Sequence, residues 1–359
     1  MAGQAELEAV RRAVVLSRSA LGATSPNPPV GAVVLDADGT VVGEGATRPP
    51  GGPHAEVVAL AQAGERARGG TAVVTLEPCR HTGRTGPCTD ALLAAGVARV
   101  VVSCTDPTDS AGGGADVLRA AGVDVETGVL AGEVARGPLE AWLTSRRTGR
   151  PFVTWKFAAT LDGRSAAADG TSRWITGESS RADVHRLRAE ADAVVAGVGT
   201  VLADDPLLDA RGAADLPQPL RVVVDTRGRT PLTARALQGR SPALVVTGPL
   251  LEDPGHPRRR EVVTDATGSV DLRALLASLQ DEDGVVSVLL EGGPSLAGAF
   301  LATGLVDRVV AYVAPALLGA GPAALGDAGV GTIADVHRLQ VDDVARSGED
   351  VRLVLRPEM

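Results

Sequence analysis

The chain is 359 residues long, which is more than one ordinary domain needs, so we expect two domains. Hydrophobic residues form 44% of the sequence but aromatic residues only 2%, so the cores must be built mainly from Ala, Val and Leu. The formal net charge of -9 argues against a general nucleic-acid-binding surface, and an anionic ligand would need a local cluster of Arg side chains.

The cysteine content and the absence of long apolar stretches indicate the compartment. Three cysteines do not make a disulfide framework, which points to a reducing environment. The first residues are helical in character and contain no apolar signal core. No stretch approaches the ~18 apolar residues of a membrane span. We therefore predict a cytoplasmic protein with neither a membrane nor a nucleic acid as its partner.

The N-terminal segment predicts a helix followed by a hairpin. Residues 5–20 place apolar side chains on one side of a helix, and strands are predicted over 32–35 and 41–45. Before the first strand, Asn27 stands between two prolines. It either forms a turn or presents its amide, which can donate and accept hydrogen bonds, to the edge of a ligand ring.

Four residues in the next part of the chain indicate a metal centre. His54 and Glu56 form a His-x-Glu motif, and Cys79 and Cys88 follow, with eight residues between them. One imidazole and two thiolates suit tetrahedral Zn²⁺, and three protein ligands leave a fourth position for water. Glu56 is then placed to move protons for that water. This pattern is typical of zinc-dependent deaminases of nucleobases and related rings, although two residues usually separate the cysteines.

Two other interpretations of these residues stay open. The cysteines could be core thiols and His54 a helix cap, but Glu56 and the Pro-Cys step would then be coincidences. A structural zinc site with His81 as its fourth ligand is the stronger competitor, but it also leaves Glu56 without a role.

Strands and helices alternate through the rest of this half. A strand over 72–76 ends at the predicted metal loop, and a helix over 89–95 begins after Cys88, where the helix dipole favours a thiolate. The glycine-rich segment 110–114 could bind phosphate but is more often only a loop. Further elements are predicted at 97–103, 115–121 and 123–125, and Cys104 should be a buried thiol at a strand end. The alternation predicts a three-layer α/β domain with a partly parallel sheet.

A polar and basic segment over 144–151 marks the domain boundary, which gives domains 1–147 and 148–359. A new strand begins at 152–157. Lys156 interrupts its apolar run, so an anion or a polar ligand should lie near this side chain.

The second domain continues with a helix that ends near Glu190 and a series of buried strands. The strand at 193–200 runs into a glycine turn, and the strand at 286–290 leads to Gly292-Gly293 and a helix start. Amides at such a helix tip can cradle a phosphate, but this signal alone is weak. No Gly-x-Gly-x-x-Gly motif follows a strand with a downstream acid, so a Rossmann site is unsupported. Other strands are predicted at 220–224, 243–247, 308–313 and 351–355.

In combination these segments resemble a known family. Over nearly its whole length the chain is similar to the bifunctional riboflavin-biosynthesis deaminase–reductases, and the long spacing between the cysteines is the family's own. The segments that carry the resemblance are Pro26-Asn27-Pro28, Pro53-His54-Ala55-Glu56, Thr75-Leu76-Glu77-Pro78-Cys79, Gly83-Arg84-Thr85, Pro87-Cys88, Leu161-Asp162-Gly163, Trp174-Ile175-Thr176, Thr200 to Leu208 and Glu291-Gly292-Gly293-Pro294.

The resemblance implies a first domain of cytidine-deaminase type. It would remove the 2-amino group of 2,5-diamino-6-(5-phosphoribosylamino)pyrimidin-4-one by hydrolysis. His54, Cys79 and Cys88 would be the zinc ligands, and Glu56 would be the catalytic proton shuttle.

The resemblance also implies a second domain with the fold of dihydrofolate reductase, which would pass a hydride from NADPH to the ribose C1′ and leave a ribityl chain. NADPH would contact Ala158, Trp174, Thr200, Asp204, Thr226, Gly293, Pro294, Ser295, Leu296, Ala297, Gly298 and Ala299. The substrate would contact Ser172, Arg188, Leu208, Arg211 and Glu291. On the residues alone, Asn27 in the first domain and Lys156 in the second are further candidates for substrate binding. Arg188 and Arg211 would be the local cations for a sugar phosphate. A homodimer or tetramer is expected from the same resemblance.

The chain departs from the family pattern at Gly86, where Pro is usual, and at Asp106-Pro107, where Asn-Pro is common. A competing interpretation keeps the zinc deaminase and makes the second domain inactive. A nucleic-acid deaminase would need basic and aromatic surface, which is scarce here, and a zinc-scaffolded interaction protein would release no ammonia.

Overall fold

The computed structural model describes residues 1–83, 86–212, 217–239, 241–250 and 254–358. The chain divides into two compact units, Met1–Gly149 and Arg150–Met359. Helix α6 (Glu140–Thr148) closes the first unit and ends at Gly149, whose φ of 68° is a left-handed conformation that glycine adopts readily. Much of the polar segment expected to separate the domains is therefore helical.

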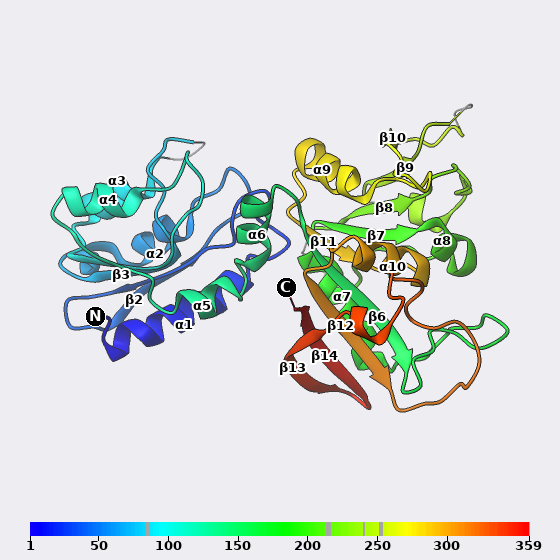
Figure 1. Ribbon diagram of the computed structural model, residues 1–359. Coiled ribbons are helices and arrows are strands. Elements are labelled where there is room, and N and C mark those ends of the chain that lie inside the picture. Colours follow the sequence, from blue (N-terminus) through cyan, green and yellow to red (C-terminus); the bar gives the residue numbers. More distant parts are fainter. Residues whose placement is uncertain (84–85, 213–216, 240, 251–253, 359) are drawn as a thin grey trace. The chain divides into compact units, whose positions relative to one another are not determined.

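The first unit contains a mixed sheet, with five strands among the described residues. They are β1 (Gly31–Leu35), β2 (Val41–Ala46), β3 (Thr71–Leu76), β4 (Arg99–Cys104) and β5 (Asp124–Thr127). Their order is β2-β1-β3-β4-β5, with β1 antiparallel to both of its neighbours and β3, β4 and β5 parallel (Figure 1). β3 and β4 are almost wholly buried and rich in Val, as expected for parallel strands covered on both faces.

Helices cover both faces of this sheet and give the three layers expected from the sequence. They are α1 (Gln4–Arg18), α2 (Ala55–Ala63), α3 (Cys88–Ala95), α4 (Gly114–Ala120) and α5 (Ala131–Ala135), with a 3-10 turn at Gly64–Ala67. α1 and α5 lie on one face, and α2, α3 and α4 on the other (Figure 1). Glycines in the strands allow close approach: a Cβ at Gly31 would lie 1.9 Å from the carbonyl oxygen of Ala13 in α1.

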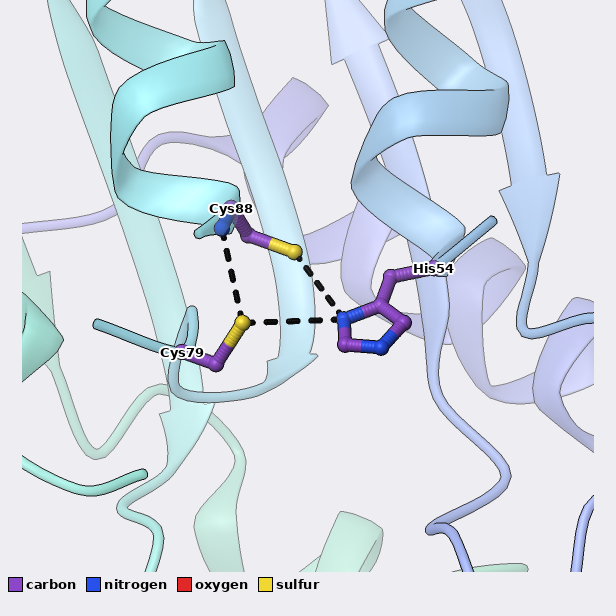
Figure 2. Close-up of side chains that lie close together, drawn as sticks. All are labelled: His54, Cys79 and Cys88. Atoms are coloured by element: carbon purple, nitrogen blue, oxygen red, sulfur yellow. Dashed lines mark hydrogen bonds between the residues drawn. The ribbon is translucent and has the colours of Figure 1, made fainter. Parts of the chain in front are cut away.

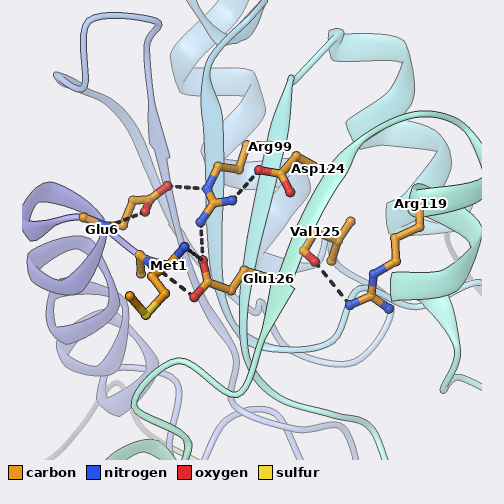
Figure 3. Close-up of polar contacts among 9 residues, drawn as sticks. Met1, Glu6, Arg99, Arg119, Asp124, Val125 and Glu126 are labelled. Atoms are coloured by element: carbon orange, nitrogen blue, oxygen red, sulfur yellow. Dashed lines mark hydrogen bonds and ion pairs between the residues drawn. The ribbon is translucent and has the colours of Figure 1, made fainter.

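Charged side chains around Arg99 tie α1 to the edge of the sheet (Figure 3). Arg99 begins β4, and its Nε donates to Glu6 of α1 at 2.7 Å. Its other nitrogens donate to Asp124 and Glu126 of β5. Glu126 also accepts from the backbone N–H of Ala2 at 3.0 Å. Because the Arg99 guanidinium is largely buried, this cluster should stabilise the unit more than an exposed ion pair would.

The second unit is built on a sheet in which nine strands are seen across the described ranges. They are β6 (Phe152–Thr160), β7 (Ala193–Gly197), β8 (Leu220–Val224), β9 (Ala243–Thr247), β10 (Arg259–Glu261), β11 (Ser287–Leu290), β12 (Arg308–Ala314), β13 (Leu339–Ser347) and β14 (Asp350–Pro357). Their order is β10-β9-β8-β7-β11-β6-β12-β14-β13 (Figure 1). Neighbours from β10 to β12 are parallel, and β14 and β13 extend one edge in antiparallel fashion. The carboxyl ends of the parallel strands therefore share one edge of the sheet.

Two hydrophobic layers lie on opposite faces of this sheet. The helices are α7 (Glu178–Glu190), α8 (Val198–Asp204), α9 (Leu272–Asp283) and α10 (Pro294–Ala302), with 3-10 turns at Arg235–Leu237 and Ile333–Asp335. Leu276 of α9 and Phe300 of α10 pack on the face that carries Val195, whereas α8 packs on the face that carries Val194. Neighbouring residues of β7 thus enter different cores, because side chains alternate along a strand.

Several elements of the second unit differ from the sequence-based expectation, among them β10 and α9, which the sequence analysis does not predict. The residues after Gly197 form helix α8 instead of a glycine turn, and Gly197 is its extended N-cap. Strand β13 is not predicted by the sequence, because its exposed, partly charged residues do not alternate cleanly and a β-bulge between Val341 and Asp343 breaks the period of two. No helix in the described part of the chain is long and apolar enough to cross a membrane.

Candidate functional site

Three side chains with metal-ligand chemistry converge at the end of β3 in the first unit (Figure 2). His54 is the N-cap of α2, Cys79 follows β3, and Cys88 is the first residue of α3. Two helix N-termini and a strand end thus bring together residues that are far apart in the sequence. The dipole of α3 favours the thiolate form of Cys88.

The ligand atoms of these residues all lie within 4.8 Å of one another. Nδ1 of His54 lies 3.2 Å from Sγ of Cys88 and 3.6 Å from Sγ of Cys79 (Figure 2). The backbone N–H of Cys88 points at Sγ of Cys79, 3.4 Å away. Bonds from zinc to nitrogen and sulfur are about 2.0–2.3 Å long, so one ion can be reached by all three atoms. The donor set therefore fits zinc.

Glu56 lies beside this cluster, in the first turn of α2. It is only 5% exposed, which is unusual for a carboxyl group without a buried cation as its partner. Burial raises the pKa of Glu56 above its ordinary value. A carboxyl group tuned in this direction is suited to taking up and releasing a proton near neutral pH.

The two thiols of the cluster differ in acidity. The hydrogen bond from Cys88 lowers the pKa of Cys79, and the contact with Cys79 raises the pKa of Cys88. The two thiols therefore titrate as a coupled pair, and the thiolate is the form that binds metal.

The sequence also singles out His81 and Asn27 in the first unit. His81 is exposed, and it does not belong to the group of residues that could hold a metal among those described. Asn27 closes a turn, in which its backbone N–H donates to the carbonyl of Thr24 at 2.8 Å. Arg84 and Thr85, which belong to the family-like segment, lie outside the described residues.

The glycine-rich segment before α4 serves close packing. A Cβ at Gly114 would lie 1.8 Å from the carbonyl oxygen of Pro78, the residue before Cys79. One at Gly112 would lie 2.6 Å from that of Asp106. These contacts favour the loop interpretation over phosphate binding, because the glycines let the backbone of α4 approach the metal loop.

The second unit contains a cavity of about 1790 Å³ at the carboxyl ends of its parallel strands. Its wall includes Lys156 of β6, Gly197 of β7 and Thr226 after β8. Ligands of α/β sheets usually bind at this edge. The volume exceeds the roughly 300–1,000 Å³ of a typical small-molecule pocket, so a dinucleotide and a second ligand can be held together.

The cavity brings together most of the residues that the sequence assigns to the reductase. The predicted cofactor contacts that line the cavity are Ala158, Trp174, Thr200, Asp204, Thr226, Gly293, Pro294, Ser295, Leu296 and Ala299. The predicted substrate contacts that line it are Lys156, Ser172, Arg188, Leu208, Arg211 and Glu291. Ala297 and Gly298 do not line it. Ala297 is fully buried in the core, and a Cβ at Gly298 would lie 2.0 Å from the carbonyl oxygen of Asp327.

Glu291 is the centre of a buried ion cluster in the cavity wall. Its carboxylate accepts hydrogen bonds from Nε and Nη2 of Arg188, the latter at 3.0 Å, and Nζ of Lys156 lies 3.3 Å away. Burial alone would raise the pKa of Glu291, but Arg188 and Lys156 hold it at about 2. The anionic partner expected for Lys156 is therefore a protein carboxylate.

Sequence reasoning missed several polar residues of the cavity wall. His185 lies on α7 three residues before Arg188, and Arg227 and Arg229 follow β8. The spacing of His185 is the signal that could have revealed it, because residues three apart share a face of a helix.

Both units match known families. A family model for the cytidine and deoxycytidylate deaminase zinc-binding region matches residues 4–104, and one for the RibD C-terminal domain matches residues 151–353. The riboflavin biosynthesis protein RibD of Mycobacterium tuberculosis is 48% identical to the chain, over 97% of this chain and 96% of that relative. RibD of Escherichia coli is 41% identical, over 96% and 97% respectively.

Solved structures give the same result for the fold. Acinetobacter baumannii RibD in its form 1 is 40% identical, with a TM-score of 0.89 over 99% of both chains. A Thermotoga maritima structure, described as a diaminohydroxyphosphoribosylaminopyrimidine deaminase/5-amino-6-(5-phosphoribosylamino)uracil reductase, is 34% identical, with a TM-score of 0.89 over 99% of both chains.

Proposed function

Because the chain belongs to the RibD family of riboflavin-biosynthesis proteins, we propose which of its residues carry out the two reactions. The chain is a bifunctional enzyme with a zinc-dependent deaminase and an NADPH-dependent reductase. We assign the deaminase to residues 1–147 and the reductase to residues 148–359. An inactive second domain is not favoured, since the RibD C-terminal domain match spans residues 151–353.

For the deaminase, we propose a diaminopyrimidinone substrate, as named in the description of the Thermotoga maritima structure. His54, Cys79 and Cys88 would hold zinc, which would supply the Lewis acidity that makes water nucleophilic near neutral pH. Glu56 would take one proton from the attacking water and give it to the ring nitrogen. It would then take the remaining proton of the added water and give it to the departing amine. The buried position of Glu56, where it interacts with His54, Cys79 and Cys88, is the observation that carries this proposal.

For the reductase, NADPH supplies the hydride that converts the ribosyl group into a ribityl chain. We propose that Arg188 and Arg211 bind the sugar phosphate, while Glu291 and Lys156 form the wall beside it. Lys156, Arg188 and Arg211 face two carboxylates, those of Glu291 and of Asp209, which lies 3.4 Å from Nε of Arg211. The group keeps a net positive charge, which favours an anionic ligand even though the whole chain is acidic. The cofactor occupies the part of the cavity lined by Trp174 and the start of α10 together with the other cofactor contacts named above.

We also propose that the protein forms a homodimer or tetramer and works in the cytoplasm. Val341 and Val344 on the edge strand β13 are 56% and 59% exposed, which supports an interface between copies. Cys79, Cys88 and Cys104 form no disulfide bond, which supports a reducing compartment.

The test supplies the diaminopyrimidinone substrate to the purified zinc-loaded protein with and without NADPH. Ammonia should appear in both cases, and nicotinamide absorbance should fall only when NADPH is present. A second reaction starts from 5-amino-6-(5-phosphoribosylamino)uracil and bypasses the first step. Ammonia release in the first reaction together with no NADPH oxidation in the second would favour an inactive second domain instead.

A further inference from the structure

Two side chains of α7 hold the segment 205–211, which carries the proposed substrate contacts Leu208 and Arg211. Nη1 of Arg188 donates to the backbone carbonyl of Asp209 at 3.1 Å. The backbone N–H of Arg211 donates to Nδ1 of His185 at 3.2 Å. His185 and Arg188 are three residues apart on one helix face, so the segment is hydrogen-bonded to α7 at two neighbouring points.

The segment 205–211 needs this support because its backbone is not relaxed. Asp205 and Leu208 have φ values of 41° and 56°, in the left-handed region that residues with a side chain rarely adopt. Such conformations persist only where surrounding contacts fix them. Gln218 supplies another contact, since its side chain accepts from and donates to the backbone of Ala210 at 2.9 and 2.8 Å. His185 holds the backbone of the next residue, Arg211, and so helps to fix where the Arg211 side chain starts.

The hydrogen bond to Arg211 exists only with a neutral imidazole. Nδ1 accepts when the proton is on Nε2, whereas a protonated ring has no acceptor. The charged groups that face His185 are Arg188 on its own helix and Asp209 and Arg211 on the segment, and Arg188 is in turn paired with Glu291 and so linked to Lys156. Burial, together with the charges of Arg188 and Arg211, lowers the pKa of His185 from 6.5, and Asp209 opposes this less strongly.

We propose that His185 is a positioning residue of the reductase: its neutral ring fixes Arg211 against the sugar phosphate of the substrate, and protonation of the ring releases Arg211. This inference rests on the proposed function, which assigns the sugar phosphate to Arg188 and Arg211. His185 itself does not touch the reacting atoms.

The test compares two substitutions of His185 in the full-length enzyme. His185→Leu removes the acceptor, whereas His185→Asn keeps an acceptor oxygen near the place of Nδ1 but cannot titrate. His337→Leu is the control, because His337 is exposed and does not line the cavity. For 5-amino-6-(5-phosphoribosylamino)uracil we expect His185→Leu to raise KM roughly fivefold, the value of one ordinary hydrogen bond, with kcat within about twofold. His185→Asn should restore most of the KM.

The pH profile separates positioning from a general loss of structure. The wild-type KM should rise as the pH falls below 6.5 and His185 takes up its proton. His185→Asn should lack this rise, and His185→Leu should show a raised KM at every pH. NADPH affinity, followed by tryptophan fluorescence, should stay within twofold in both variants.

Binding of ribose 5-phosphate distinguishes failure of this inference from failure of the proposed phosphate site. If Arg211→Ala leaves its affinity unchanged, the phosphate assignment is wrong. If Arg211→Ala weakens binding but His185→Leu does not, only the role of His185 is overturned. The role of His185 is also overturned if His185→Asn keeps the wild-type rise in KM at low pH. This measurement tests the role of His185 even if the Leu variant does not fold.

Discussion

Glu291 and Arg188 face each other as a bidentate pair, with two guanidinium nitrogens of Arg188 donating to the two carboxylate oxygens of Glu291. Lys156 places a second cation on the same carboxylate. All three side chains are less than one-fifth exposed, so neither cation can be left unpaired without a cost in stability. The pair therefore links the stability of the second unit to the shape of the reductase cavity.

Replacing Glu291 tests this link. Glu291→Gln keeps the shape but leaves two buried cations without a countercharge, so we expect the free energy of unfolding of the second unit to fall by about 3 kcal/mol. Reductase kcat/KM should fall at least tenfold, while ammonia release is unchanged. Urea unfolding and NADPH oxidation measure the two effects. Glu261→Gln, at a half-exposed carboxylate paired with Arg259, is the matched control and should change neither. A fully stable Glu291→Gln variant would show that the cluster is not structural.

The acidity of Glu291 also predicts how stability depends on pH. Its pKa is about 2 in the folded state and 4.5 ordinarily, so between these values the unfolded chain binds a proton that the folded chain does not. The contribution is fully present above pH 4.5 and is lost as the pH falls toward 2; it amounts to about 3 kcal/mol. Calorimetry should show the stabilities of the wild type and Glu291→Gln converging over this range. Parallel curves would contradict the assignment.

Removal of a proposed metal ligand should abolish only the first reaction. Zinc content, measured by elemental analysis, should fall from about one per chain to near zero in Cys88→Ser, because two remaining ligands do not hold the ion tightly. Ammonia release should disappear, and reduction of the deaminated substrate should continue. His81→Ala is the control and should keep its zinc, since His81 is exposed and apart from the cluster. Loss of zinc in His81→Ala would revive the structural-site interpretation.

Glu56 should separate metal binding from catalysis. Glu56→Gln retains size and hydrogen bonding but cannot accept a proton, so we expect zinc to stay bound and deamination to slow by about 10³-fold. Glu65→Gln, at an exposed carboxyl group nearby in the chain, should behave as the wild type. Deamination at more than a tenth of the wild-type rate in Glu56→Gln would exclude Glu56 as the proton shuttle.

Gly114 is expected to matter for the metal loop although it binds nothing. A methyl group at this position would lie 1.8 Å from the Pro78 carbonyl oxygen, so Gly114→Ala must displace α4 or the loop that carries Cys79. We expect a loss of about 3 kcal/mol in unfolding free energy and weaker zinc binding. Gly86→Ala, at a position with open space, is the control in the same loop. Equal zinc affinity in the two variants would mean that the loop adapts freely.

The sequence indicates the metal site almost completely, because His54, Glu56, Cys79 and Cys88 are of types and spacings that few other chemistries use. Their arrangement in space needs only a strand end and two helix starts, which local patterns also predict. Most of the buried strands are found in the same way, since runs such as the Val-rich β4 are unambiguous.

The rest depends on tertiary contacts that no local pattern contains. β13 is held by its pairing with β14, and its own residues are exposed and interrupted by a bulge. α8 follows Gly197, a glycine for which the sequence predicts a turn. His185 gains its role only because the segment with Arg211 folds against α7, 26 positions further along the chain. Likewise, the sequence predicts that Lys156 has a polar or charged partner, but only the order of the strands in the sheet identifies that partner as Glu291.

The two candidate sites draw their side chains from opposite sides of the junction between Gly149 and Arg150, and no described residue contributes to both. Among the described residues, each proposed site therefore draws on one unit alone. Cutting the chain at this junction, or encoding the two units as separate proteins, should leave two independent enzymes. Either unit could then be lost, exchanged or improved without changes to the other.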